Sequence, residues 1–152
     1  MDVNNINPFM ESFNLVMPQL GFSNIKKGNL SVKDKEITNT GVIMLVGIVG
    51  DIKGNVAYSL DMDSAKKVAS KMMMDMPIEE FGEMEKSALS ELSNMLTASA
   101  VTIFSSSEVF VDISTPTLLQ GDNVSLKIGS GKILCIQLFA DDIPIDINIS
   151  FD

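Results

Sequence analysis

The sequence predicts an α+β domain in which helices cover one face of a mostly antiparallel sheet. A β-branched run at residues 42–49 precedes turn residues, as in a β-hairpin. Apolar residues recur at helical spacing between residues 61 and 104, and strand patterns fill the chain after residue 107. At 152 residues the chain is long enough for one domain, residues 1–152, with a substantial core.

The opening segment is expected to form a helix. Asn7 can cap it, and Pro8 suits its first turn. Pro18 should kink or shorten this helix, and Gly21 is placed to end it. Residues 23–40 are polar and show little pattern, so a short strand and a loop are expected there.

A hairpin and a second helix are expected next. The run at residues 42–49 is typical of a strand buried on both faces, and the segment 56–61 alternates apolar and polar residues after a turn at 50–55. Asp61 or Asp63 can cap the following helix. The apolar face of that helix comprises Ala65, Val68, Ala69, Met72 and Met73.

The longest helix is expected over about residues 78–104, with Asp75 as its cap and a break near Gly82. Within it, Glu91 and Asn94 are three residues apart and therefore lie side by side. The acid can accept a proton or pair with a cation, and the carboxamide can hold a water without titrating. This pair is the best candidate for chemistry. The polar face is expected to comprise Glu83, Ser87, Ser90, Glu91, Asn94 and Thr97.

Strand patterns dominate the remainder of the chain. A turn is expected at 121–123, and Asp141 and Asp142 are expected to join the last two strands. The final segment alternates strictly, so one of its faces should be buried and the other exposed to water. Pro144 indicates a sheet edge or a strand entry. The expected strands are 109–113, 124–128, 132–140 and 143–151.

Composition excludes several classes of site. The net charge of −9 argues against nucleic acids and anionic membranes as partners. All 11 basic residues are lysines, so a bidentate arginine clamp for phosphate is excluded. The absence of histidine removes the usual general base and the commonest metal ligand. No metal site is expected, because the acidic residues at 79–85 follow helical spacing and need not converge on one point.

The single cysteine, Cys135, lies in a strand pattern and is expected to be a buried, inert thiol. One cysteine cannot form an internal disulfide, which fits a reducing compartment. The N-terminus lacks the pattern of a signal peptide, and no apolar run approaches the ~18 residues of a membrane span. A cytoplasmic location is therefore expected.

The segment Ser87-x-x-x-Glu91-x-x-Asn94-Met95, with Pro116 following 22 residues after the asparagine, resembles the signature of the CheC/CheX/FliY family of chemotaxis phosphatases. Val-Gly-Ile-Val-Gly at 46–50 and Val-Asp-Ile-Ser-Thr-Pro-Thr at 111–117 are similar to further segments of that family. The single Glu-x-x-Asn copy favours the CheX branch. Ala98 stands where family members often carry glycine, which bears on docking geometry.

The resemblance implies a phosphatase that hydrolyses the phospho-aspartate of a CheY-type response regulator in two-component signalling. It implies that Asn94 orients the attacking water and that Glu91 pairs with a lysine of the regulator. No cofactor is expected on this chain, because the regulator would supply Mg²⁺. A homodimer that pairs through strands near the C-terminus is also implied. Four further residues are expected to border the contact: Ser87, Ser90, Met95 and Pro116.

Two other functional classes remain open. A non-catalytic adaptor of the same fold would bind partners without this pair, as the middle domain of the flagellar switch protein FliM does. A regulatory domain for small molecules would show a pocket between the sheet and a helix. Polar residues at 87, 91 and 94 are also what the solvated face of any amphipathic helix carries.

Overall fold

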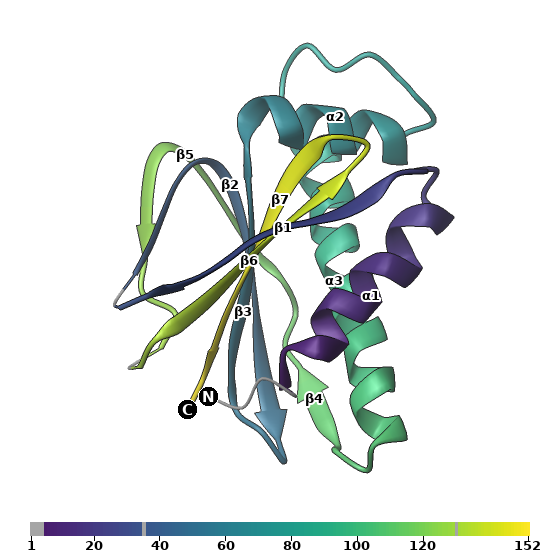
Figure 1. Cartoon of the computed structure of the whole chain (residues 1–152). Coiled ribbons are helices and arrows are strands. Elements are labelled where there is room, and N and C mark those ends of the chain that lie inside the picture. Colours follow the sequence, from purple (N-terminus) through teal and green to yellow (C-terminus); the bar gives the residue numbers. More distant parts are fainter. Residues whose placement is uncertain (1–4, 35, 130) are drawn as a thin grey trace.

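The computed structural model describes residues 5–34, 36–129 and 131–152. Within them, three helices lie together on one face of a seven-stranded sheet, as the sequence predicts (Figure 1). The helices are α1 (Asn7–Gln19), α2 (Met62–Met72) and α3 (Glu83–Ser106). The strands are β1 (Ile25–Lys33), β2 (Ile37–Gly50), β3 (Gly54–Asp61), β4 (Val111–Ile113), β5 (Thr117–Leu126), β6 (Ile133–Ala140) and β7 (Ile143–Phe151).

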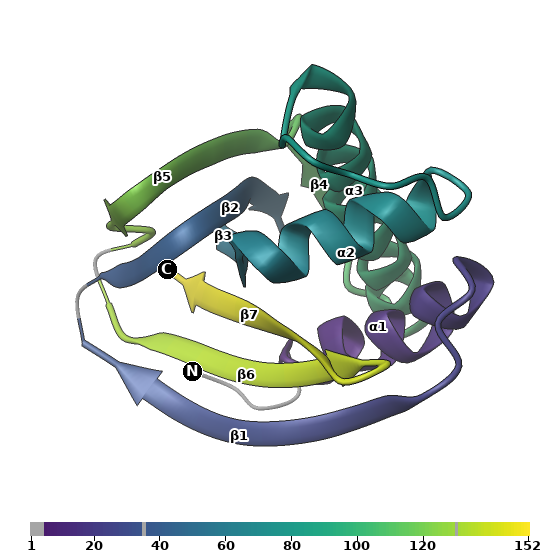
Figure 2. The ribbon, with the colours of Figure 1, turned by 90° about the horizontal axis from the view of Figure 1, so that it is seen from above.

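Every strand pairing in the described sheet is antiparallel, which confirms the predicted fold class. The strand order is β1-β6-β7-β3-β2, and β2 pairs on its other side with both β5 and β4. Figure 2 shows β1 and β5 at opposite edges of the curved sheet. The prediction that strands near the C-terminus form a free edge of the sheet is therefore wrong, because β6 and β7 lie inside it. Pro144 accordingly marks a strand entry and not an edge.

The main core fills the space between the helices and the sheet. Each helix presents an apolar side and each strand an apolar face, so the two layers bury one another. α1 packs along α3, and the rings of Phe9 and Phe104 meet edge-on with their centroids 5.8 Å apart. The most deeply buried side chains include Phe13, Met17, Val46, Tyr58, Leu89, Leu92, Leu96 and Ile147.

The ends of the first two helices follow the predicted signals with one exception. The N-cap of α1 is Ile6, without a side-chain hydrogen bond, so the prediction of Asn7 as the cap is wrong. Gly21 follows the helix with a φ of +100°, a conformation that glycine adopts without strain. Asp61 caps α2 as expected, and its carboxylate accepts a hydrogen bond from the backbone N–H of Ser64 at 2.7 Å.

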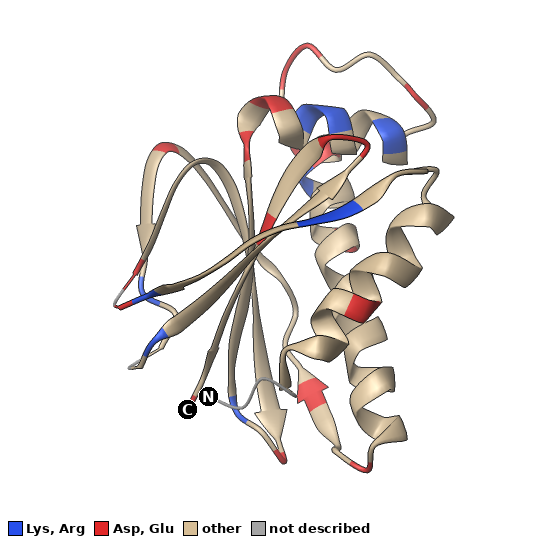
Figure 3. Cartoon of the chain, in the orientation of Figure 1, with Lys and Arg blue, Asp and Glu red and all other residues tan. Residues whose placement is uncertain are grey.

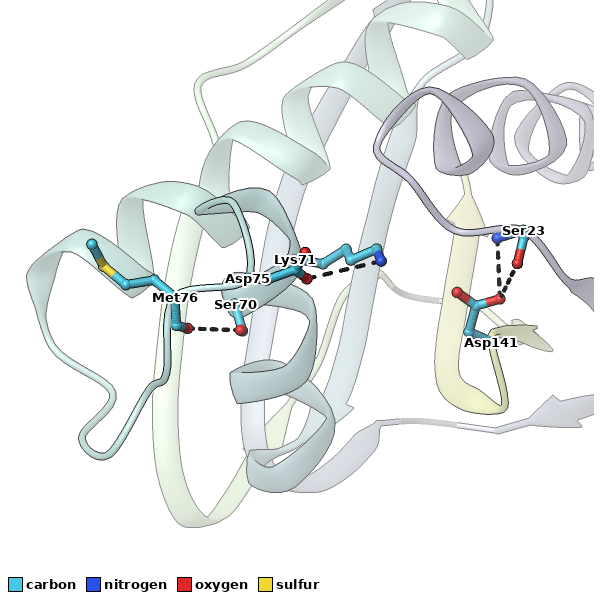
Figure 4. A network of polar contacts seen from close by, with 6 residues as sticks. All are labelled: Ser23, Ser70, Lys71, Asp75, Met76 and Asp141. Carbon is cyan, nitrogen blue, oxygen red and sulfur yellow. Dashed lines mark hydrogen bonds and ion pairs between the residues drawn. The ribbon is translucent and has the colours of Figure 1, made fainter.

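The loop between α2 and α3 is fastened to the end of α2 (Figure 4). Met74 and Asp75 both adopt left-handed backbone conformations, which turn the chain sharply away from the helix. The Ser70 hydroxyl donates a hydrogen bond to the carbonyl of Met76 at 2.7 Å, and Lys71 Nζ lies 3.9 Å from the Asp75 carboxylate. These contacts hold the residues that the sequence assigns to the start of the next helix.

α3 begins at Glu83, later than the predicted start near residue 78. Pro77 disfavours helical backbone at the residue before it, and the segment that follows stays in a loop. Gly82 forms the N-cap, and its backbone N–H donates to the Glu85 carboxylate at 2.9 Å. The break expected near Gly82 is thus the true beginning of the helix.

Long-range pairing overrides local composition in two segments. β5 runs through residues 121–123, so the turn predicted there is wrong. It pairs with β2 over residues 37–45, where a register shift between Asn39 and Gly41 accommodates the irregular stretch. Residues 23–40 contain all of β1 and the start of β2, and not the single short strand expected.

The hairpin between β6 and β7 is confirmed, with Asp141 and Asp142 at its turn. Their φ angles of 49° and 66° match the left-handed pair that a type I′ turn requires. The Asp141 carboxylate accepts hydrogen bonds from the backbone N–H groups of Asn24 and Ser23, at 2.8 and 3.1 Å (Figure 4). These bonds lower the pKa of Asp141 and join the turn to the start of β1.

The face of the sheet opposite the helices carries a second, smaller core. The prediction that this side of β7 is exposed to water is wrong for Asn148 and Ser150, which are fully buried. The Asn148 amide donates to the Ala57 carbonyl at 3.0 Å and to the Ser59 hydroxyl at 3.1 Å. Cys135 lies opposite Asn148 and is buried as expected, and burial raises the pKa of its thiol. The second core comprises Ile37, Ile43, Ala57, Ile128 and Ile133.

Candidate functional site

Glu91 and Asn94 lie on the side of α3 that faces away from the main core. Leu89, Leu92 and Leu96 are buried on the opposite side and fix the rotation of the helix. Glu91 is exposed and Asn94 is half-buried, so both polar groups remain accessible from outside. Their spacing of three residues brings the two Cβ atoms within about 5–6 Å of each other.

Thr97 does not belong to the exposed polar face, contrary to the prediction. It is fully buried, and its hydroxyl lies 2.9 Å from the Tyr58 hydroxyl of β3. The Thr97 hydroxyl also donates to the carbonyl of Ser93 at 2.7 Å. This chain of hydrogen bonds ties α3 to the sheet one helical turn from Asn94.

A shallow pocket of about 680 Å³ lies between α3 and the segment that joins β4 to β5. Five of the six predicted site residues line it, on one wall or the other: Ser87, Ser90, Glu91, Asn94 and Pro116. Met95 does not line it, because its side chain is half-buried and packs against the main core. The pocket therefore unites residues more than twenty positions apart in the sequence.

The second wall of the pocket is held by Ser114. Its backbone N–H donates to the carbonyl of Gly47 at 2.9 Å, and its hydroxyl accepts a hydrogen bond from the Gly47 N–H at 2.8 Å. This pair of bonds fixes the loop against β2, so that Thr115 and Pro116 face α3 across the pocket. Ser114 and Thr115 were not among the predicted site residues, although both lie in the segment 111–117 that resembles the family.

Charge in the pocket is sparse. Glu83, Lys86 and Glu91 are its ionisable residues, and Lys86 Nζ lies 3.3 Å from the Glu83 carboxylate. Within residues 5–34, 36–129 and 131–152, neither the Glu91 carboxylate nor the Asn94 amide has a hydrogen-bond or ion-pair partner in the fold. The pocket thus presents one unpaired acid and one free carboxamide to whatever enters it.

Figure 3 shows the basic residues of α2 gathered at the end of the molecule that also holds the loop between α2 and α3.

Among the described side chains, no group of three or more Cys, Asp or Glu residues is arranged to hold a metal ion. Of the helices in the described part of the chain, none has the length and apolar character needed to cross a membrane.

Comparison with known proteins adds an independent line of evidence. Residues 42–139 match the family model described as chemotaxis phosphatase CheX. The CheY-P phosphatase CheX of Thermotoga maritima is 31% identical over 110 residues, which cover 72% of this chain and 70% of that protein.

Solved structures agree in fold over almost the whole chain. A CheC-like superfamily protein from Shewanella superposes with a TM-score of 0.88 at 25% identity, and covers 100% of this chain and 99% of its own. CheX in the CheX–CheY–BeF3–Mg²⁺ complex of Borrelia burgdorferi has a TM-score of 0.82 at 25% identity, with 96% of each chain covered. The match in sequence spans more than half of the chain, and the fold agrees from end to end. The chain therefore belongs to the CheX family of chemotaxis phosphatases.

Proposed function

We propose that this protein hydrolyses the phospho-aspartate of a CheY-type response regulator by inserting the Glu91–Asn94 face of α3 into the regulator's active site. The observation that carries this proposal is the pair itself: a carboxylate and a carboxamide side by side, accessible, and without partners in the fold. The CheY-P phosphatase of Thermotoga and the CheX–CheY complex of Borrelia support the same substrate class.

Asn94 has the chemistry required of the group that aligns the water. An acyl phosphate is already reactive, so its hydrolysis is limited by bringing a water in line with the phosphorus atom. A carboxamide can donate to and accept from that water without becoming a charged base. Asn94 is half-buried, so its carboxamide remains accessible to a water at the surface of α3.

Glu91 sets the register of docking in this proposal. A carboxylate beside a phosphoryl group is repelled unless a cation lies between them. Glu91 therefore points to a lysine of the regulator, and the charge-assisted hydrogen bond places Asn94 one turn away over the phosphorus. Mg²⁺ belongs to the regulator's site, which this chain approaches without a metal of its own.

Phosphate release tests the proposal. The wild-type protein should accelerate loss of phosphate from a phosphorylated CheY-type receiver, and Asn94→Ala should lower that acceleration about 100-fold. Asn123→Ala, which changes an exposed asparagine on β5, should leave the rate unchanged. An unaltered decay of the phosphorylated receiver in the presence of the wild type would remove the enzymatic function and favour the adaptor class.

We also propose that the protein forms a homodimer through an edge of its sheet. β1 is an edge strand, and its Leu30 and Val32 side chains are 54% and 57% exposed. An unpaired strand edge with apolar side chains is a template for pairing with a second copy. Light scattering should report twice the monomer mass, and Val32→Lys should shift it toward the monomer. A monomeric wild type at micromolar concentration would contradict the dimer.

A further inference from the structure

Lys86 is the only cation among the described residues that line the pocket, and no step of the proposed chemistry uses it. It lies on the same ridge of α3 as Ser90 and Asn94, because residues four apart stack along one side of a helix. Lys86 therefore occupies the end of the pocket nearest the start of α3, and Asn94 lies two helical turns further along.

The position of Lys86 runs against the electrostatics of its helix. It is the fourth residue of α3, where the positive end of the helix dipole favours acidic side chains. Glu83 and Glu85 follow that preference in the same turn, and Lys86 does not. A residue that violates a local rule inside a pocket is a candidate for function.

The intramolecular partner of Lys86 can be exchanged at little cost. Its ion pair with Glu83 is 3.3 Å long, but the Glu83 side chain is 92% exposed and the Lys86 side chain 35% exposed. Exposed pairs of this kind contribute little to stability. The Lys86 ammonium group can therefore exchange Glu83 for an incoming carboxylate.

We infer that Lys86 binds an acidic side chain of the response regulator at the rim of its phosphorylated site. This inference rests on the proposed function. Asn94 follows Lys86 by eight positions on α3, which is a rise of about 12 Å at 1.5 Å per residue. When Asn94 faces the phosphorus atom, Lys86 therefore lies over the surrounding protein surface and not over the phosphoryl group.

Such a contact adds to the attraction between Glu91 and the regulator's lysine, because the overall charge of the chain opposes the substrate. The chain has a net charge of −9, and the substrate carries a phosphoryl group. A rim cation offsets this repulsion locally and favours one orientation of approach. Lys86 thus contributes to regulator affinity and choice, while Asn94 contributes to the chemical step.

Steady-state kinetics with a phosphorylated regulator separate these roles. Lys86→Gln should raise KM about fivefold, the change that about 1 kcal/mol of lost attraction produces, and leave kcat unchanged. Glu83→Gln, which releases Lys86 from its internal partner, should lower KM. Lys86→Arg should keep the wild-type KM, and Lys67→Gln on α2 is the control with the same loss of charge.

Two outcomes would overturn the inference. One is that Lys86→Gln and Glu83→Gln leave KM unaltered or change it in the same direction. That result is expected if the Lys86–Glu83 ion pair only stabilises the helix. The other is that Lys86→Gln weakens binding of the phosphorylated regulator but not of the unphosphorylated regulator. The proposed acidic side chain is present in both forms, so both affinities should fall. A wild type without phosphatase activity would remove the proposed function as well, whereas an active wild type with these results removes only the role of Lys86.

Discussion

The buried contact between Tyr58 and Thr97 allows a quantitative prediction about how α3 is held on the sheet. The Thr97 hydroxyl has one hydrogen, which it donates to the Ser93 carbonyl at 2.7 Å. The Tyr58 hydroxyl must therefore be the donor across the 2.9 Å contact with Thr97. Replacing either partner alone has different consequences, because only one of the two changes leaves a buried donor without an acceptor.

Tyr58→Phe removes one net hydrogen bond and should lower the free energy of unfolding by about 1 kcal/mol. Thr97→Val removes the hydrogen-bond acceptor of the fully buried Tyr58 hydroxyl. The unsatisfied hydroxyl should raise the loss of unfolding free energy to about 2–3 kcal/mol. The double variant has no stranded group, so it should be more stable than Thr97→Val alone. The coupling energy of the cycle should then be about 1 kcal/mol or more.

Urea unfolding followed by far-ultraviolet circular dichroism measures all four proteins. The midpoints should differ while the slope of free energy against urea stays constant. Equal costs for Tyr58→Phe and Thr97→Val, or a double variant as unstable as the sum of the two, would refute the assigned direction of the hydrogen bond.

Three further predictions concern titration and the pocket wall. Burial raises the pKa of Tyr58, so folding keeps the phenol protonated. The contribution of the neutral phenol to stability is present below the unfolded pKa near 10 and is lost as the pH rises beyond it. The free energy of unfolding should therefore fall more steeply at alkaline pH for the wild type than for Tyr58→Phe. Burial also raises the pKa of Asp146, so ionising this carboxyl group costs more free energy in the folded than in the unfolded protein. Asp146→Asn should therefore stabilise the protein at pH 7 and have no effect at pH 3, and destabilisation at pH 7 would contradict this. Ser114→Ala removes the acceptor for the Gly47 N–H and should loosen the second wall of the pocket. KM for the regulator should rise about threefold, and the free energy of unfolding should fall by about 1 kcal/mol or less. Ser125→Ala on β5 should change neither quantity.

Local patterns are sufficient to predict the elements whose signals are carried by neighbouring residues. The β-branched run and turn of the β2–β3 hairpin, the Asp61 cap of α2 and the Asp141–Asp142 turn depend on contacts a few residues apart. The apolar spacing of α3 also predicts which side of that helix is buried, and so which side displays Glu91 and Asn94.

The elements that could not be predicted depend on distant partners. Residues 121–123 resemble a turn, but pairing with β2 holds them in a strand. Asn148 alternates as an exposed residue would, but it is fully buried and donates hydrogen bonds to Ala57 and Ser59 of β3. The segment before α3 is fastened to the end of α2 by the hydrogen bond from Ser70 to Met76, a contact that the helical spacing from residue 78 does not report.

The candidate site divides in the same way. Its helical wall follows from the Glu-x-x-Asn spacing, which the sequence displays directly. Its other wall depends on the hydrogen bonds between Gly47 and Ser114, residues that are far apart in the chain. Lys86 also lines the pocket, although the predicted polar face of this helix did not include it.

The central claim is that a neutral carboxamide on α3 carries out the chemical step inside another protein's active site. The most direct measurement is the single-turnover rate constant for phosphate loss from a phosphorylated CheY-type receiver. The wild type or Asn94→Ala is present in saturating excess over the receiver. A fall of about 100-fold for Asn94→Ala with unchanged receiver affinity is the result expected. Equal rate constants for the variant and the wild type would show that hydrolysis proceeds without this side chain, and the mechanism would have to be abandoned.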